Sequence, residues 1–95
     1  MSIPTAIANL KLLSFTYEGY SRVVEPHTYG IDAKGHRALR AYQVSGGSSS
    51  GTPEGWRMFH EREMRNVTVL AEGFSGPRPK YKRGDSQFRS IVAQL

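Results

Sequence analysis

The sequence contains no cysteine among its 95 residues. A disulfide framework, a thiolate zinc site and a cysteine nucleophile are therefore all excluded. The longest apolar runs are far shorter than the ~20 residues that a membrane-spanning helix needs, so no membrane partner is expected. No basic segment followed by a long apolar run stands at the N-terminus, and no signal peptide is predicted. We expect a cytoplasmic protein.

Patterns typical of catalysis are incomplete. His60 and Glu61 begin like a zinc-protease helix, but Met64 stands where the second histidine must lie one helical turn further on. The other two histidines, His27 and His36, fall on separate expected elements, and no set of nucleophile, base and orienting group can be assembled. We expect no catalytic residue, no metal site, no cofactor and no enzyme activity.

Positive charge is in excess. Thirteen Lys and Arg residues against eight Asp and Glu residues give a formal charge of +5. A basic surface attracts nucleic acid, anionic membranes or acidic ligands, but such a charge on a small domain also serves solubility alone. The placement of the basic residues along the chain therefore matters more than their number.

Hydrophobic periodicity predicts a mostly β protein. Residues 2–11 read as a short helix that Ser2 caps, and five strands follow, over 13–17, 22–31, 37–44, 56–60 and 66–72. Pro26 interrupts the second strand, which must be an edge strand or bend there because proline donates no hydrogen bond. Residues 45–55 are rich in Gly and Ser and predict a flexible connection.

The end of the chain predicts a second helix. Apolar residues recur there at helical spacing, at Phe88, Ile91, Val92 and Leu95. We expect one domain over 1–95, with a small five-stranded SH3-like or Sm-like barrel over about 12–72. A basic tail and the C-terminal amphipathic helix are expected over 76–95.

Several segments are similar to a known family. Leu-Ser-Phe-Thr-Tyr at 13–17, Arg-Val-Val-Glu-Pro at 22–26, Gly35, a strand ending at Tyr42, and Arg57-Met58-Phe59 with Arg62 together resemble a WYL domain. The resemblance covers roughly residues 6–70. It implies an Sm-like or SH3-like five-stranded barrel that serves bacterial regulators as a ligand-sensing or nucleic-acid-binding module.

Two departures from the family pattern limit what the resemblance implies. Arg37-Ala38-Leu39 stands in place of the name-giving Trp-Tyr-Leu, so any role of that aromatic pair is not carried over. No DNA-reading helix precedes the first strand within this sequence, so we do not expect a complete transcription factor.

Arginines of the expected barrel form a first set of candidate ligand-binding residues. They are Arg22, Arg37, Arg40, Arg57, Arg62 and Arg65, with Tyr42 on the same strand face as Arg40. Arginine pairs bidentately with phosphate, and an aromatic ring beside a cation suits single-stranded nucleic acid or a nucleotide-like ligand. The resemblance ranks Arg57 and Arg62 first. Alternatively, these two pair with Glu25, Glu61 or Glu63 and only hold the barrel together.

The basic tail supplies a second set. It contains Arg78, Lys80, Lys82, Arg83 and Arg89 with a single acid, Asp85, and Tyr81 lies among them. Such a segment can follow a phosphate backbone with strongly salt-dependent affinity, or it can be a solvated linker. Trp56 is interpreted as packing rather than as a platform for base stacking.

These observations favour a non-catalytic binding module for nucleic acid or a nucleotide-like anionic effector. The resemblance adds a role in bacterial transcription regulation. The alternative is a protein–protein interaction module that docks on a separate regulator, or that forms a homo-oligomer through the C-terminal helix.

Overall fold

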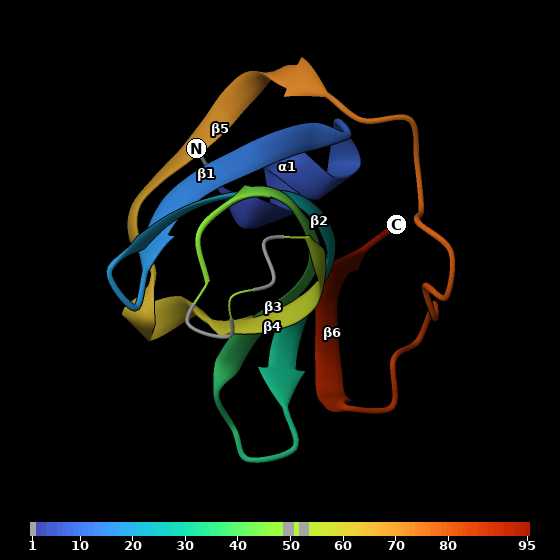
Figure 1. Cartoon of the computed structure of the whole chain (residues 1–95). Helices are drawn as coiled ribbons and strands as arrows, with labels where there is room; N and C mark the ends of the chain where they lie inside the picture. The colour runs from blue at the N-terminus through green and yellow to red at the C-terminus, as the bar shows by residue number, and fades with distance from the viewer. Residues whose placement is uncertain (1, 49–50, 52–53) are drawn as a thin grey trace.

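The computed structural model describes residues 2–48, 51 and 54–95. Within them the chain forms α1 (Ile3–Ala8), β1 (Lys11–Tyr17), β2 (Tyr20–Asp32), β3 (Arg37–Gly46), β4 (Gly55–His60), the short 3-10 helix η1 (Glu61–Glu63), β5 (Arg65–Gly73) and β6 (Phe88–Gln94) (Figure 1). The predicted mostly β architecture is confirmed. Residues 49–50 and 52–53 of the expected flexible connection lie outside the described residues.

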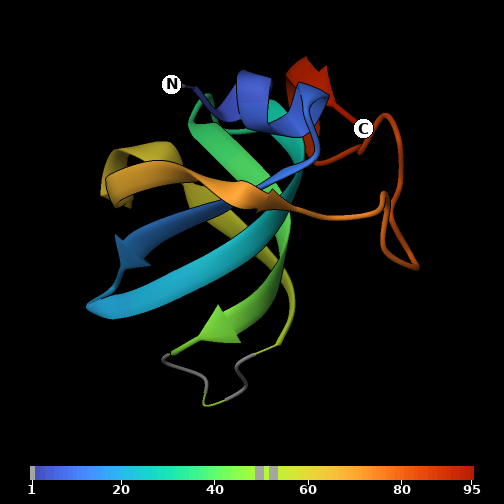
Figure 2. The ribbon, with the colours of Figure 1, turned by 90° about the horizontal axis from the view of Figure 1, so that it is seen from above.

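All strand pairs are antiparallel, and five strands follow one another in the order β4-β3-β2-β1-β5. The sixth, β6, pairs with β2 off this path. Seen from above, the strands curve around a common interior (Figure 2). The path of paired strands is nevertheless open between β4 and β5, so a closed five-stranded barrel is not shown.

The N-terminal helix begins as its sequence predicts. Ser2 is the N-cap, and its hydroxyl accepts a hydrogen bond from the Thr5 backbone N–H at 3.2 Å. Ile3 and Ile7 are buried against the sheet. The helix ends at Ala8, earlier than expected, because β1 already begins at Lys11. No helix in the described part of the chain is long and apolar enough to cross a membrane.

Alternating strand residues build the core. In β1, Leu13, Phe15 and Tyr17 are buried, while the residues between them are only partly so. The rings of Phe15 and Tyr17 each meet Phe59 of β4 edge to face, with centroids 4.9 Å apart. Leu39 is fully buried and fills the core although the aromatic pair of the family pattern is missing.

Strand β2 is long and changes partners along its length. Residues 20–24 pair with β1 on one side, whereas residues 28–32 pair with β6 on that side. Pro26 lies between the two stretches, where neither β1 nor β6 pairs with β2. The β2–β3 register shifts between Pro26 and Thr28, which makes His27 the extra residue of a bulge. The predicted irregularity at Pro26 thus coincides with a bulge and with a point where neither β1 nor β6 pairs with β2.

The predicted C-terminal helix is wrong, because Phe88–Gln94 is the strand β6. The second half of β2 is left without a partner by β1, and its backbone groups need hydrogen bonds. β6 supplies them, with Ile91 opposite Gly30 and Ala93 opposite Tyr29. Residues 88–94 therefore form a strand, despite their helical spacing of apolar residues, because the edge of β2 is available for pairing.

Candidate functional site

Residues 74–87, between β5 and β6, pack against the sheet and are called the docked segment below. The predicted alternative of a solvated linker does not describe them. The indole N–H of Trp56 donates to the Pro79 carbonyl at 3.1 Å. The Tyr81 hydroxyl donates to the Leu95 carbonyl at 2.9 Å, and the Gly84 N–H donates to the Gln94 side chain at 2.8 Å. The segment runs along one side of the molecule in both ribbon views (Figures 1 and 2).

His27 is the buried centre of these contacts. Its ring meets the rings of Trp56, Phe74 and Tyr81, with centroids 4.7, 5.8 and 5.2 Å away. Nδ1 lies 2.8 Å from the Glu25 carbonyl, and Nε2 accepts the Arg78 N–H at 3.1 Å. A carbonyl only accepts and an N–H only donates, so these partners select the neutral tautomer with hydrogen on Nδ1. Burial accordingly lowers the pKa of His27.

The side chain of Arg78 provides a second contact between the docked segment and β2. Its guanidinium donates to both carboxylate oxygens of Glu25, at 2.8 and 3.1 Å, and lies 4.4 Å from the centroid of the Tyr42 ring. The hydrogen bond that Arg78 donates to Glu25 raises the pKa of Arg78. This bidentate pair stabilises the docked segment, and Glu25 is thereby engaged by Arg78.

A cavity of about 260 Å³ opens between the docked segment and the strands β3 and β4. Its lining consists of Arg40, Trp56, Lys80, Tyr81, Lys82, Asp85, Ser86 and Gln87. The rings of Trp56 and Tyr81 are nearly parallel, with an interplanar angle of 17° and centroids 6.5 Å apart. Trp56 is partly exposed, so it both packs on His27 and faces the cavity.

The cationic side chains of the cavity differ in whether they are paired with a carboxylate. Arg40 pairs with Asp85 at 3.3 Å and hydrogen-bonds Gln87, so part of its charge is offset. Lys80 and Lys82 are exposed, and neither pairs with a carboxylate among the described residues. Lys80 holds a φ of +72°, a left-handed conformation that is strained for lysine. Arg83 lies just outside, with its Nε donating to the Leu95 carbonyl at 3.2 Å.

The remaining predicted arginines lie elsewhere. Arg22 is buried and donates to Gln43, the Tyr17 carbonyl and Glu18. Arg57 donates to Gln43 at 3.1 Å and lines a different cavity together with Arg22.

Arg37 and Arg62 are exposed and line a third cavity with Gly35, His36 and Glu61. The strand arginines therefore do not form the single surface that strand alternation suggested. Of that set, only Arg40 joins the basic tail, because the docked segment reaches the part of β3 that carries it.

Sequence reasoning missed His27 and the stacking of Trp56 with Tyr81. The clues were Pro26, which predicted an irregularity beside His27, and an aromatic residue inside the basic run. Neither clue states which strand the tail docks on. The structure also brings His36 and His60, which the sequence had placed on separate elements, together with Asp32.

Comparison of the chain with family models, curated proteins and solved structures found no match. Membership of the WYL family therefore stays a prediction from the sequence segments that resemble it. The function has to be argued from the geometry of the cavity.

Proposed function

We propose that the protein binds single-stranded nucleic acid in the cavity beside the docked segment, without chemistry on its ligand. The observation that carries this proposal is the meeting of two separately predicted basic sets. Arg40 from β3 and the lysines Lys80 and Lys82 line one cavity together with two aromatic rings. Cationic grooves with exposed rings are the common means of holding single strands without sequence preference.

The size of the cavity supports a single nucleotide unit as its occupant. Sites for drug-sized ligands span roughly 300–1,000 Å³, and this one measures about 260 Å³. A large cofactor does not fit such a volume, whereas one base or sugar-phosphate unit of a longer strand does. The rest of the strand would continue over the exposed basic surface.

The residues that line the cavity would have different roles in binding. Lys80 and Lys82 present exposed ammonium groups to phosphate oxygens. Arg40 is held in place by Asp85 and Gln87, so it fixes the wall of the cavity more than it adds net charge. Trp56 and Tyr81 offer ring faces, and base stacking on such rings is worth about 1–3 kcal/mol per base.

The proposal also covers the biological role, the location and the fold family of the protein. A regulatory role in bacterial transcription, a cytoplasmic location and closure of the sheet into an Sm-like or SH3-like barrel are all supported only by sequence resemblance and composition. A free nucleotide-like effector uses the same chemistry as a strand, and the binding experiment distinguishes the two.

The proposal is tested by fluorescence polarisation with labelled DNA and RNA strands of about 12 nucleotides. A duplex and a mononucleotide competitor form the comparison arms, and measurements are made at about 50 and 200 mM salt. Single strands should bind with a Kd below ~100 μM at low salt, the range of non-specific binding. Equal competition by the mononucleotide would instead identify a small effector as the ligand.

Two lysine substitutions locate the site. Lys80→Gly removes an ammonium group where φ of +72° suits glycine, so the fold is kept. Combined with Lys82→Ala, it should lower the salt slope of log K by about 1.4, or ~0.7 for each lost phosphate contact. Lys34→Ala, in the β2–β3 turn outside the cavity, is the matched control. Absence of binding at ~100 μM and low salt would sink the proposal, as would a double variant that binds like wild type.

Self-association is a second candidate, favoured by one apolar region. Val67 and Val92 are 41% and 52% exposed and border a cavity of about 420 Å³ that Ile3 and Pro4 also line. Apolar side chains gathered at one cavity are a common contact surface between protein copies. Sedimentation velocity should then show a dimer that Val92→Asp dissociates, and a purely monomeric wild type would rule this candidate out.

A further inference from the structure

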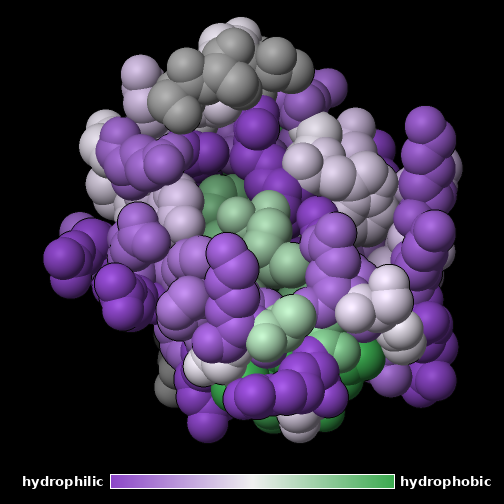
Figure 3. Space-filling model, turned by 90° about the horizontal axis from the view of Figure 1, so that it is seen from below, coloured by the Kyte–Doolittle hydropathy of each residue, from purple (hydrophilic) through white to green (hydrophobic). Residues whose placement is uncertain are grey.

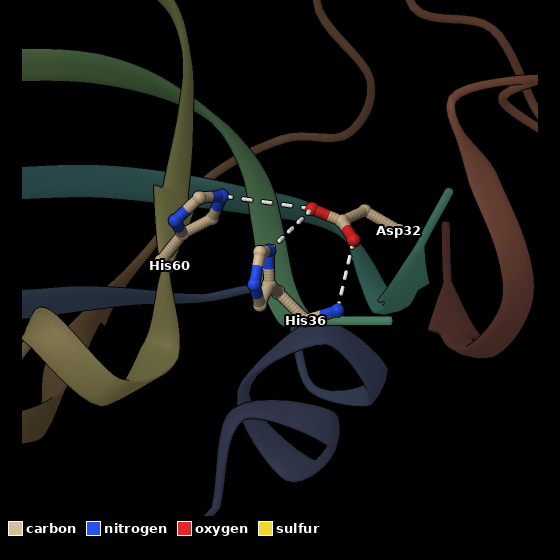
Figure 4. A group of neighbouring side chains, drawn as sticks. All are labelled: Asp32, His36 and His60. Atoms are coloured by element: carbon tan, nitrogen blue, oxygen red, sulfur yellow. Dashed lines mark hydrogen bonds and ion pairs between the residues drawn. The ribbon is translucent and has the colours of Figure 1, made fainter. Parts of the chain in front are cut away.

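Three metal-ligating side chains meet at the end of the molecule that carries the β2–β3 turn (Figure 4). Asp32 ends β2, His36 precedes β3, and His60 ends β4. One ligand atom from each lies within 4.8 Å of the other two. The Oδ2 atom of Asp32 stands 3.6 Å from Nδ1 of His36 and 3.6 Å from Nε2 of His60.

The β2–β3 turn fixes the carboxylate so that only one oxygen faces the imidazoles. Oδ1 of Asp32 accepts the backbone N–H groups of Lys34 at 3.0 Å and His36 at 2.8 Å. Gly35, with φ of +87°, lets the chain reverse between them. Oδ2 is left to point at the two histidine rings (Figure 4).

His60 is oriented from both sides of its ring. The β3–β4 register places it opposite Ala38, close to the start of β3 where His36 lies. Its Nδ1 faces the Glu63 carboxylate at 3.6 Å while its Nε2 faces Asp32. A carboxylate behind an imidazole selects the tautomer whose other nitrogen has its lone pair available for a metal.

His36 provides an independent observation. Its Nδ1 atom is buried and has no hydrogen-bond partner among the described residues. Buried polar nitrogens are nearly always satisfied, so an unsatisfied one needs an explanation. Oδ2 of Asp32 is 3.6 Å away, too far for a hydrogen bond, and a metal ion between the two atoms would bridge them.

We propose that Asp32, His36 and His60 form a binding site for a divalent transition metal, with Zn²⁺ as the expected occupant. Zinc bonds of roughly 2.0–2.2 Å in tetrahedral geometry separate ligand atoms by about 3.3–3.4 Å. The two 3.6 Å separations are a few tenths of an ångström longer than this, and the third, which is no more than 4.8 Å, would also have to shorten on binding. Imidazole and carboxylate donors are compatible with zinc.

Three protein donors leave a fourth position for water or an external ligand. Solvent can reach it, because the side chains of His36 and His60 are 41% and 37% exposed. The face of the molecule seen from that end is hydrophilic around a central hydrophobic patch (Figure 3). None of the three ligands lines the cavity proposed for nucleic acid, so the metal site stands apart from that function.

The test is calorimetric titration of ZnCl₂ into untagged, metal-free protein. Wild type should bind one equivalent, and Zn²⁺ should raise its Tm because only the folded state assembles the site. Asp32→Asn keeps the oxygen that holds the turn and replaces only the oxygen that faces the imidazoles. This variant and His60→Ala should each weaken binding more than 10-fold, while Glu63→Gln should weaken it about 10-fold.

The controls separate ligation from loss of fold. Asp85→Asn removes a carboxylate outside the cluster and should bind Zn²⁺ like wild type. Where Asp32→Asn proves unfolded by circular dichroism, the half-exposed His60 decides the question through His60→Ala. Absence of saturable Zn²⁺ binding to wild type would overturn the proposal. Wild-type affinity in a folded His60→Ala variant would overturn it too.

Discussion

His27 is the residue on which the contacts around the candidate cavity converge. It is the extra residue of the β2 bulge, and its ring is buried between Trp56, Phe74 and Tyr81. Its two nitrogens have partners that fit only the neutral ring. Protonation of Nε2 would break the hydrogen bond from the Arg78 backbone and place a charge in an apolar environment. The docked segment is therefore coupled to the protonation of this histidine.

This coupling predicts acid sensitivity. Because burial lowers the pKa of His27, the unfolded chain binds a proton here more readily than the folded protein. The stability associated with the neutral ring is complete above about pH 6.5 and is lost as the pH falls toward the folded pKa. The free energy of unfolding in urea should fall between about pH 7 and pH 5, and His27→Gln should reduce this dependence. An unchanged pH dependence in His27→Gln would contradict the account.

Residue type alone did not assign the roles of the basic side chains. Arg22 and Arg40 are both strand arginines, yet Arg22 is buried among aromatic rings and Arg40 lines the cavity. The two arginines differ in the face of the sheet on which they lie and in their distance from the docked segment. The face cannot be deduced from one strand alone, because a register error of one residue exchanges the two faces. The position of the docked segment cannot be deduced from the strands either.

At the scale of elements, the first five strands follow from the sequence and β6 does not. Alternation such as Leu13, Phe15 and Tyr17 predicts β1 because one face of the strand is buried. The apolar residues of β6 also fit helical spacing, since Phe88, Ile91 and Leu95 recur every three or four residues. What decides between helix and strand is the unpaired half of β2, a feature of the fold and not of residues 88–94.

Gly30 is the position that admits β6. A Cβ at Gly30 would lie 2.9 Å from the Ile91 Cα and closer still to the Ser90 carbonyl oxygen, so backbone atoms would have to move. Gly30→Ala should therefore destabilise the protein by about 1–3 kcal/mol in urea unfolding. It should also remove the protection of the β6 amides from hydrogen exchange.

Ser90→Ala is the control for Gly30→Ala, because it changes an exposed β6 side chain without touching the close backbone approach. Wild-type stability in Gly30→Ala would show that β6 does not pack on β2 in solution. Tyr81, Arg83 and Gly84 are hydrogen-bonded to the end of β6, so loss of β6 pairing should also disturb the cavity. Nucleic-acid binding should therefore weaken in Gly30→Ala.

At the scale of the whole molecule, a curved antiparallel sheet carries two sets of functional candidates at different places. One is the cationic and aromatic cavity beside the docked segment, and the other is the Asp32, His36 and His60 cluster at the β2–β3 end. The sequence predicted the basic residues because charge is visible along the chain. It could not predict either assembly, because His36 and His60 or Arg40 and Lys82 become neighbours only through strand register and the docking of residues 74–87.

The most direct test of the central claim uses Trp56, the single tryptophan of the chain. An unlabelled single-stranded oligonucleotide is titrated into the protein at low salt while tryptophan emission is recorded. Stacking or close approach of a base in the cavity should quench the emission saturably. Added salt should reverse the quenching, and Lys80→Gly with Lys82→Ala should require more strand to reach it. Strand binding measured by polarisation without any change in Trp56 emission would contradict the proposed site.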